Sequence, residues 1–237
     1  MNKSAPLITG TVISYLEMCH EENAHLQRGM NYRLHGKHSV ILMSVRRDAP
    51  YADRFEEGGD VLIYEGHNVP NVRNSPINPK QVDQPMFSPV GSLTANGRFH
   101  EAAQDYKQGH RQAELVKVYE KVLSGVWVYN GFFRIVDAWQ QWDGTRSVFK
   151  FKMEVSDQHD SDILLQTENL PHQRLIPTEV KLAVWKRDKG QCILCHSQDN
   201  LHFDHIIPFS KGGSSLLTEN IQILCARHNL SKGDNIE

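Results

Sequence analysis

The C-terminal part of the chain carries cysteine and histidine residues at the spacing of a metal site. Two ligand pairs, each separated by two residues, supply four candidate zinc ligands: Cys192, Cys195, Cys225 and His228. Zinc in proteins usually takes four such ligands in a tetrahedron. The spacing therefore predicts a Zn²⁺ ion around which the C-terminal end folds. Taken alone, these ligands also fit a purely structural zinc finger.

Residues suited to hydrolysis are interleaved with the zinc ligands. Asn229 follows His228 directly, and successive residues of a helix are turned by about 100°, so Asn229 is expected to face a different site. Asp204 and Asn229 are predicted to bind a catalytic Mg²⁺ or Mn²⁺ ion through oxygen atoms. His205 is predicted to be the general base that deprotonates water. Asn220 is predicted to fix the loop that orients this imidazole.

These residues resemble those of an HNH endonuclease of the ββα-metal type with a zinc knuckle. The resemblance covers about residues 177–233 and rests on the strings CILC, DHIIP, NIQILC and HN-x2-KG and on the Gly212-Gly213 loop. It implies a divalent-metal-dependent DNA endonuclease, with Asp204 and Asn229 on the catalytic metal, His205 as the base and Asn220 as the central asparagine. Many relatives have a fourth cysteine where this chain has His228, and histidine also ligates zinc well.

Length and composition are those of an ordinary globular protein. The 237 residues suit one large domain or two smaller ones, and 39% of them are hydrophobic. The net charge of −2 gives no general basic footprint, so positive charge for DNA must be gathered locally. No apolar stretch is long enough for a membrane span or a secretion signal. Three cysteines at metal spacing and a lone Cys19 fit a reducing compartment, and we expect a cytoplasmic protein.

The region before the metal motif reads as a β-rich domain. Strands are expected at residues 40–43, 60–65, 116–119, 127–129, 132–136 and 149–155, with a helix over 99–107. Many short strands of this kind favour a curved barrel, which makes the chain an α+β protein. Residues 1–155 are assigned to this domain, and the polar stretch 156–176 to a linker. The C-terminal domain is assigned to 177–237 and opens with a helix from an N-cap at Thr178 to Gly190, which buries Val180, Ala183, Val184 and Trp185.

Several strings in the N-terminal domain resemble the SET- and RING-associated (SRA) domain. They are VILMS, DAPYADRFEEGGDVLIYEGHN, LTANGRF, YNGFFRIVDAW and VFKFKMEV, over roughly residues 8–155. That family reads 5-methylcytosine by flipping the modified base out of the duplex. In its Tyr-Asp-Gly signature this chain has Asn130 in place of the aspartate.

A flipped cytosine needs aromatic faces to stack on and an acceptor for its exocyclic amine. Tyr51 and Tyr64 are the aromatic candidates. Asp53 is the candidate carboxylate, with Glu65 in reserve. Ordinary barrel packing of the tyrosines and a solvated turn position for Asp53 are the competing interpretations.

Together these features predict a modification-dependent restriction endonuclease. Its partner would be double-stranded DNA carrying 5-methylcytosine or 5-hydroxymethylcytosine, and it would act as a homodimer, because cutting both strands takes two nuclease modules. One alternative is an HNH enzyme that reads phosphorothioate or glucosylated cytosine. The other is a non-cleaving reader of modified DNA with a structural zinc domain.

Overall fold

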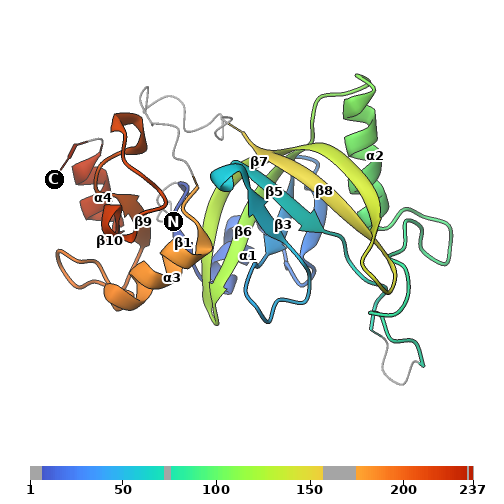
Figure 1. Cartoon of the computed structure of the whole chain (residues 1–237), viewed down its shortest axis with the longest axis horizontal. Helices are drawn as coiled ribbons and strands as arrows, with labels where there is room; N and C mark the ends of the chain where they lie inside the picture. The colour runs from blue at the N-terminus through green and yellow to red at the C-terminus, as the bar shows by residue number, and fades with distance from the viewer. Residues whose placement is uncertain (1–6, 72–75, 157–174, 234, 237) are drawn as a thin grey trace.

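A computed structural model of the chain describes residues 7–71, 76–156, 175–233 and 235–236. It has a large curved sheet and a smaller C-terminal module, which Figure 1 shows side by side, with α3 and the N-terminal segment between them. None of the helices in these described ranges has the length and apolar character needed to cross a bilayer.

The N-terminal barrel consists of eight strands, two α-helices and one 3-10 turn. Its strands follow the order β2-β3-β6-β7-β8-β5-β4, with β1 paired to β7. All of these pairs are antiparallel except β3 with β6. The elements are β1 (Val12–Ile13), α1 (Tyr15–Glu21), β2 (Met30–Leu34), β3 (His38–Met43), β4 (Arg54–Glu56), η1 (Glu57–Gly59), β5 (Val61–Glu65), α2 (Ala95–Lys107), β6 (Leu115–Leu123), β7 (Val126–Trp142) and β8 (Ser147–Val155).

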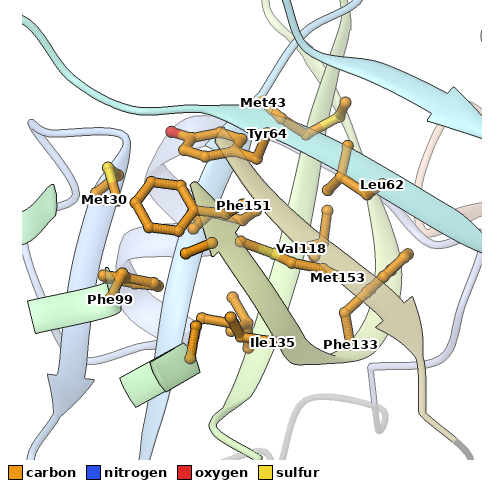
Figure 2. Close-up of a cluster of buried hydrophobic side chains, with 14 of the residues drawn as sticks. Met30, Met43, Leu62, Tyr64, Phe99, Val118, Phe133, Ile135, Phe151 and Met153 are labelled. Carbon is orange, nitrogen blue, oxygen red and sulfur yellow. The ribbon is translucent and has the colours of Figure 1, made fainter. Parts of the chain in front are cut away.

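The interior of the barrel is filled by aromatic, aliphatic and methionine side chains. Alternate residues of β8, Phe149, Phe151 and Met153, point into this core, as their period-two pattern predicts. Figure 2 shows Tyr64 and Phe99 in the same cluster, so β5 and α2 also pack on it. The expected strands 40–43, 60–65 and 149–155 are therefore present, within a residue or two of their predicted ends.

The C-terminal module is a helix followed by a hairpin and a second helix. Its β9 and β10 pair antiparallel, with Asp204 opposite Gln222 and His205 opposite Ile221. The last helix, α4, packs against both strands. The elements are α3 (Thr178–Arg187), β9 (Leu201–His205), η2 (Phe209–Lys211), η3 (Thr218–Asn220), β10 (Ile221–Cys225) and α4 (Ala226–Lys232).

Three expectations about the barrel need correction. The strands expected at 127–129 and 132–136 form one strand, β7, because Gly131 adopts a left-handed φ of 87° in a bulge instead of ending the strand. The helix expected over 99–107 begins at Ala95, after the N-cap Thr94. The short elements α1, β1, β2 and β4 were not expected.

The helix after the predicted linker also differs from the expectation. It ends at Arg187, and Pro177, not Thr178, is at its N-cap, because the Thr178 hydroxyl donates to buried Glu120. Val180 and Val184 are buried as expected and Trp185 is half-buried, but Ala183 is exposed, contrary to the expectation. Lys181, which was not singled out, is buried. Most of the linker predicted over 156–176 lies outside the described residues; at its far end Leu175 and Ile176 pack in hydrophobic cores.

Candidate functional site

The four predicted zinc ligands form a single cluster. Their ligand atoms all lie within 4.8 Å of one another. The Cys195 and Cys225 sulfurs are 3.8 Å apart, and the Cys192 and Cys225 sulfurs lie 3.3 and 3.4 Å from His228 Nδ1. A tetrahedral zinc ion with Zn–S bonds of about 2.3 Å requires edges of about 3.8 Å between sulfurs and about 3.6 Å from sulfur to nitrogen. The dimensions of the cluster are therefore close to those of a zinc site.

The Cys192 sulfur is prepared for a metal by the backbone around it. Burial alone would raise the pKa of Cys192, but backbone N–H groups at Cys225, Cys195 and Leu194, together with His228, bring it down to about 6. A thiolate is the form that binds zinc. The cluster joins the Cys192–Cys195 turn to the start of α4, so a bound ion would hold the helix against the hairpin.

Asp204 lies on the side of the hairpin that meets α4. Its Oδ2 accepts hydrogen bonds from Gln222 Nε2 at 3.0 Å and lies 3.1 Å from Lys232 Nζ. Asn229 is one helical turn before Lys232 and therefore lies on the same face of α4. Burial raises the pKa of Asp204, although Gln222 and Lys232 oppose the rise. The carboxylate oxygen of Asp204 and the amide oxygen of Asn229 are the hard donors that Mg²⁺ or Mn²⁺ prefers.

His205 is buried next to this carboxylate and is 3% exposed. Its Nε2 lies 2.8 Å from Ser215 Oγ, and its backbone carbonyl accepts from Lys232 Nζ at 2.7 Å. Burial lowers the pKa of His205 to about 4, and the charge of Lys232 acts in the same direction. The imidazole is therefore unprotonated at neutral pH, the state that a general base needs.

Asn220 closes the loop between β9 and β10. Its side-chain oxygen accepts from Ile207 N at 2.8 Å, and its nitrogen donates to the carbonyls of Ile207 and Ser214, both at 3.0 Å. These bonds join the two ends of the loop that carries Ser215, the partner of His205. Lys232 and Ser215 were not singled out from the sequence, although Lys232 is the lysine of the HN-x2-KG string.

The predicted base-pocket residues divide into two groups. Tyr51, Asp53 and Glu65 lie together, whereas Tyr64 is fully buried among core side chains (Figure 2). The Tyr64 hydroxyl lies 3.0 Å from His67 Nε2. A base-stacking role for the Tyr64 ring therefore finds no open face in this structure, and barrel packing is the better interpretation.

His67 is the aromatic partner that sequence reasoning missed. Its ring stacks on Tyr51 with centroids 4.9 Å apart and planes 7° from parallel, and Lys80 Nζ lies 4.8 Å from the Tyr51 centroid. Burial lowers the pKa of His67 to about 4, so this ring is neutral. The only signal in the sequence was its place two residues after Glu65.

Asp53 and Glu65 are held in different ways. Asp53 accepts from the backbone N–H groups of Ser44 at 3.2 Å and Glu65 at 3.0 Å. Glu65 is surrounded by donors and cations: Lys150 Nζ at 2.9 Å, Ala52 N at 3.1 Å, Gln84 Nε2 at 3.4 Å and Arg146 at 3.7 Å. Glu65 therefore stabilises the loop that carries Tyr51 and Asp53.

Comparison with known proteins finds one family match, at the C-terminal end of the chain. Residues 192–237 match the HNH endonucleases. Because of this similarity, the C-terminal module is called HNH-type. The match includes Asp204, His205, Asn220 and Asn229 and all four zinc-ligand candidates. No protein of curated function matches the chain.

The chain is also similar to solved structures of plant proteins. The SRA domain of SUVH5 with hemimethylated CG DNA is 18% identical with a TM-score of 0.46, over 71% of this chain and 95% of that one. The same domain with fully hydroxymethylated CG DNA is 20% identical with a TM-score of 0.45, over 66% and 95%. Arabidopsis thaliana SUVH6 is 21% identical with a TM-score of 0.43, over 75% and 29%. Because these TM-scores are all below 0.5, any role of the barrel has to be argued from its own side chains.

Proposed function

We propose that this chain is a modification-dependent restriction endonuclease. The barrel would bind a 5-methylcytosine or 5-hydroxymethylcytosine flipped from duplex DNA, and the HNH-type module would hydrolyse a nearby phosphodiester bond. The observation that carries the proposal is that Lys232 of α4 contacts both the Asp204 carboxylate and the backbone carbonyl of His205, in a module with HNH sequence.

The chemistry is divided among residues with different environments. Asp204 and Asn229 would hold Mg²⁺ or Mn²⁺, which stabilises charge on the phosphate and the leaving oxygen when bound. His205, kept neutral by burial, takes the proton of the attacking water at an imidazole nitrogen. Ser215 and the Asn220-closed loop hold the imidazole in place, and Lys232 fixes the carbonyl of His205.

In the barrel, Tyr51 and His67 offer flat faces beside a carboxylate. The stacked pair would separate to admit a base, or one face of Tyr51 would take it after Lys80 moves. Asp53 would accept the exocyclic amine of cytosine. Support comes from the SRA-like strings in the sequence and from the clustering of Tyr51, Asp53 and His67.

The test uses matched plasmids that are unmodified or carry 5-methylcytosine, 5-hydroxymethylcytosine, glucosylated cytosine or phosphorothioate. Each is incubated with Mg²⁺, with Mn²⁺ or with a chelator. Metal-dependent cutting confined to methylated or hydroxymethylated plasmids is the expected result. Cutting confined to the glucosylated or phosphorothioate plasmid would favour the alternative marks, and binding without cutting would favour a non-cleaving reader. Equal cutting of the unmodified plasmid would contradict the reading role.

A further inference from the structure

The HNH-type module is attached to the barrel by noncovalent contacts on two sides. The N-terminal segment runs between them: Gly10 N donates to Tyr129 O of β7 at 2.8 Å, and Phe203 N of β9 donates back to Gly10 O at 3.0 Å. Thr11 Oγ1 lies 3.1 Å from His202 Nδ1. The strand that carries Asp204 and His205 is thereby linked to the barrel sheet by backbone hydrogen bonds.

A buried polar network fixes α3 to the barrel on the other side. Lys181 Nζ lies 2.6 Å from Glu120 Oε2 and donates to Asn130 Oδ1 at 2.8 Å, while Asn130 Nδ2 donates to Glu120 at 2.9 Å. Thr178 donates to the second carboxylate oxygen. The exposures of Glu120, Lys181 and Asn130 are 0%, 1% and 2%. Burial would raise the pKa of Glu120, but Lys181 first, and then the hydrogen bonds, hold it below its usual value.

The network is placed where it can affect the nuclease site. Glu120 is on β6, and Asn130 sits in the β7 bulge beside Gly131, a feature that re-aims side chains. Asn130, Lys181 and His205 line the same small cavity at the junction. Around it, Val122 and Val128 of the barrel share a hydrophobic cluster with Val184 and Phe203 of the module. Such an interface resists separation, because parting it would expose apolar surface. Removing one partner of the ion pair would leave the other charge buried and uncompensated.

We infer that Glu120, Lys181 and Asn130 are positioning residues that hold the nuclease site at one fixed distance from the base pocket. The enzyme then cuts at a single offset from the modified cytosine. A module held without these contacts would cut over a range of positions, since its distance from the base pocket would no longer be fixed. The inference rests on the proposed function. It adds that the distance between the modified cytosine and the cleaved bond is fixed.

The first experiment maps cleavage ends on duplexes with one 5-methylcytosine. The wild-type chain should give ends at one position, and a variant with about ten Gly and Ser residues inserted after Asp160 should keep that position. Scattered wild-type ends, or ends that spread with the insertion, would overturn the inference. Absence of any methylation-dependent cutting would instead contradict the proposed function, so the two failures are distinguishable.

The second experiment breaks the network and then neutralises it. Lys181→Met leaves Glu120 buried without its cation and should spread the ends over several positions while binding to methylated DNA is retained. The double variant Lys181→Met/Glu120→Gln removes both charges at similar volume and should restore one position. Wild-type ends from folded Lys181→Met would overturn the role of the network. If Lys181→Met fails to fold, the cleavage ends of the insertion variant and of the double variant still test the inference.

Discussion

His205 is almost completely enclosed, and its environment sets its chemistry. A histidine on the surface is partly protonated near neutral pH, whereas burial and Lys232 keep the His205 ring neutral. The hydrogen-bond partner Ser215 occupies one ring nitrogen and fixes the orientation of the ring. These two effects belong to the folded hairpin and loop, not to the Asp-His dipeptide itself.

We expect His205→Ala to lower the cleavage rate by about 10²–10⁴-fold, because general-base catalysis contributes on this scale. Binding to modified DNA should be unchanged, since the barrel is untouched. Single-turnover cleavage and equilibrium binding measure the two effects separately. His110→Ala, at an exposed histidine outside both sites, is the control and should cut like the wild type. Parallel loss of DNA binding in His205→Ala would argue against a role confined to the chemical step.

Asp53 gives the barrel a pH dependence. Burial raises its pKa to about 7, despite opposing hydrogen bonds from the Glu65 and Ser44 backbone. This raised value means that the folded chain holds the proton up to about pH 7, whereas the unfolded chain loses it near pH 3.9. Asp53 therefore lowers stability as the pH rises through this window. In the proposed function, the ionised form that would accept the cytosine amine is populated only above this window.

Affinity for a duplex with modified cytosine should accordingly increase up to about tenfold between pH 6 and pH 8, following the ionised fraction. Asp53→Asn, which cannot ionise, should show no such step. The measurement is equilibrium binding at constant ionic strength, since salt alone changes DNA affinity. An equal step in wild type and variant would assign the titration to another group.

At the scale of single elements, α4 carries residues of both the metal cluster and the proposed nuclease site. Cys225 at its N-cap and His228 belong to the cluster, while Lys232 contacts Asp204. An ion in the cluster would therefore fix the helix that carries Lys232 and Asn229, which we propose to complete the nuclease site.

Removing one zinc ligand should loosen this helix. We expect Cys195→Ser to weaken zinc binding by more than about 100-fold, since even residues that only support ligands contribute 10–100-fold. The unfolding temperature of the module should fall, because metal binding and folding are coupled. Zinc content and thermal melting measure both. Cys19→Ser, at a free cysteine on α1, is the matched control and should keep its zinc. Full zinc content in Cys195→Ser would place the ion elsewhere.

At the scale of the whole molecule, each chain has one HNH-type module. We propose that one such centre cuts one strand, so that a double-strand break takes two copies on the DNA. We expect a small amount of wild type mixed with excess His205→Ala to give nicked circles, because most pairs contain one inactive centre. Gel analysis of supercoiled methylated plasmid distinguishes nicked from linear product. Linear product in unchanged proportion would indicate that one chain cuts both strands in turn.

The sequence alone was informative wherever chemistry is local. The zinc-ligand candidates come in pairs with two residues between their members, and β8 alternates with period two, so spacing predicted both the cluster and the strand. Tyr64 shows the limit: an aromatic residue on a strand has the same local pattern in a core as at a pocket. His67 was missed because stacking on Tyr51 depends on how two loop segments approach.

Only the tertiary structure decided how the two parts of the molecule meet. Glu120 and Lys181 are 61 residues apart in sequence. The residues next to Lys181 in the sequence do not distinguish a buried lysine from an exposed one. The pair forms because the Gly131 bulge and α3 arrive at the same place, a consequence of the whole sheet. Residue spacing determined which chemistry this chain carries; the packing of distant segments determined where that chemistry is held.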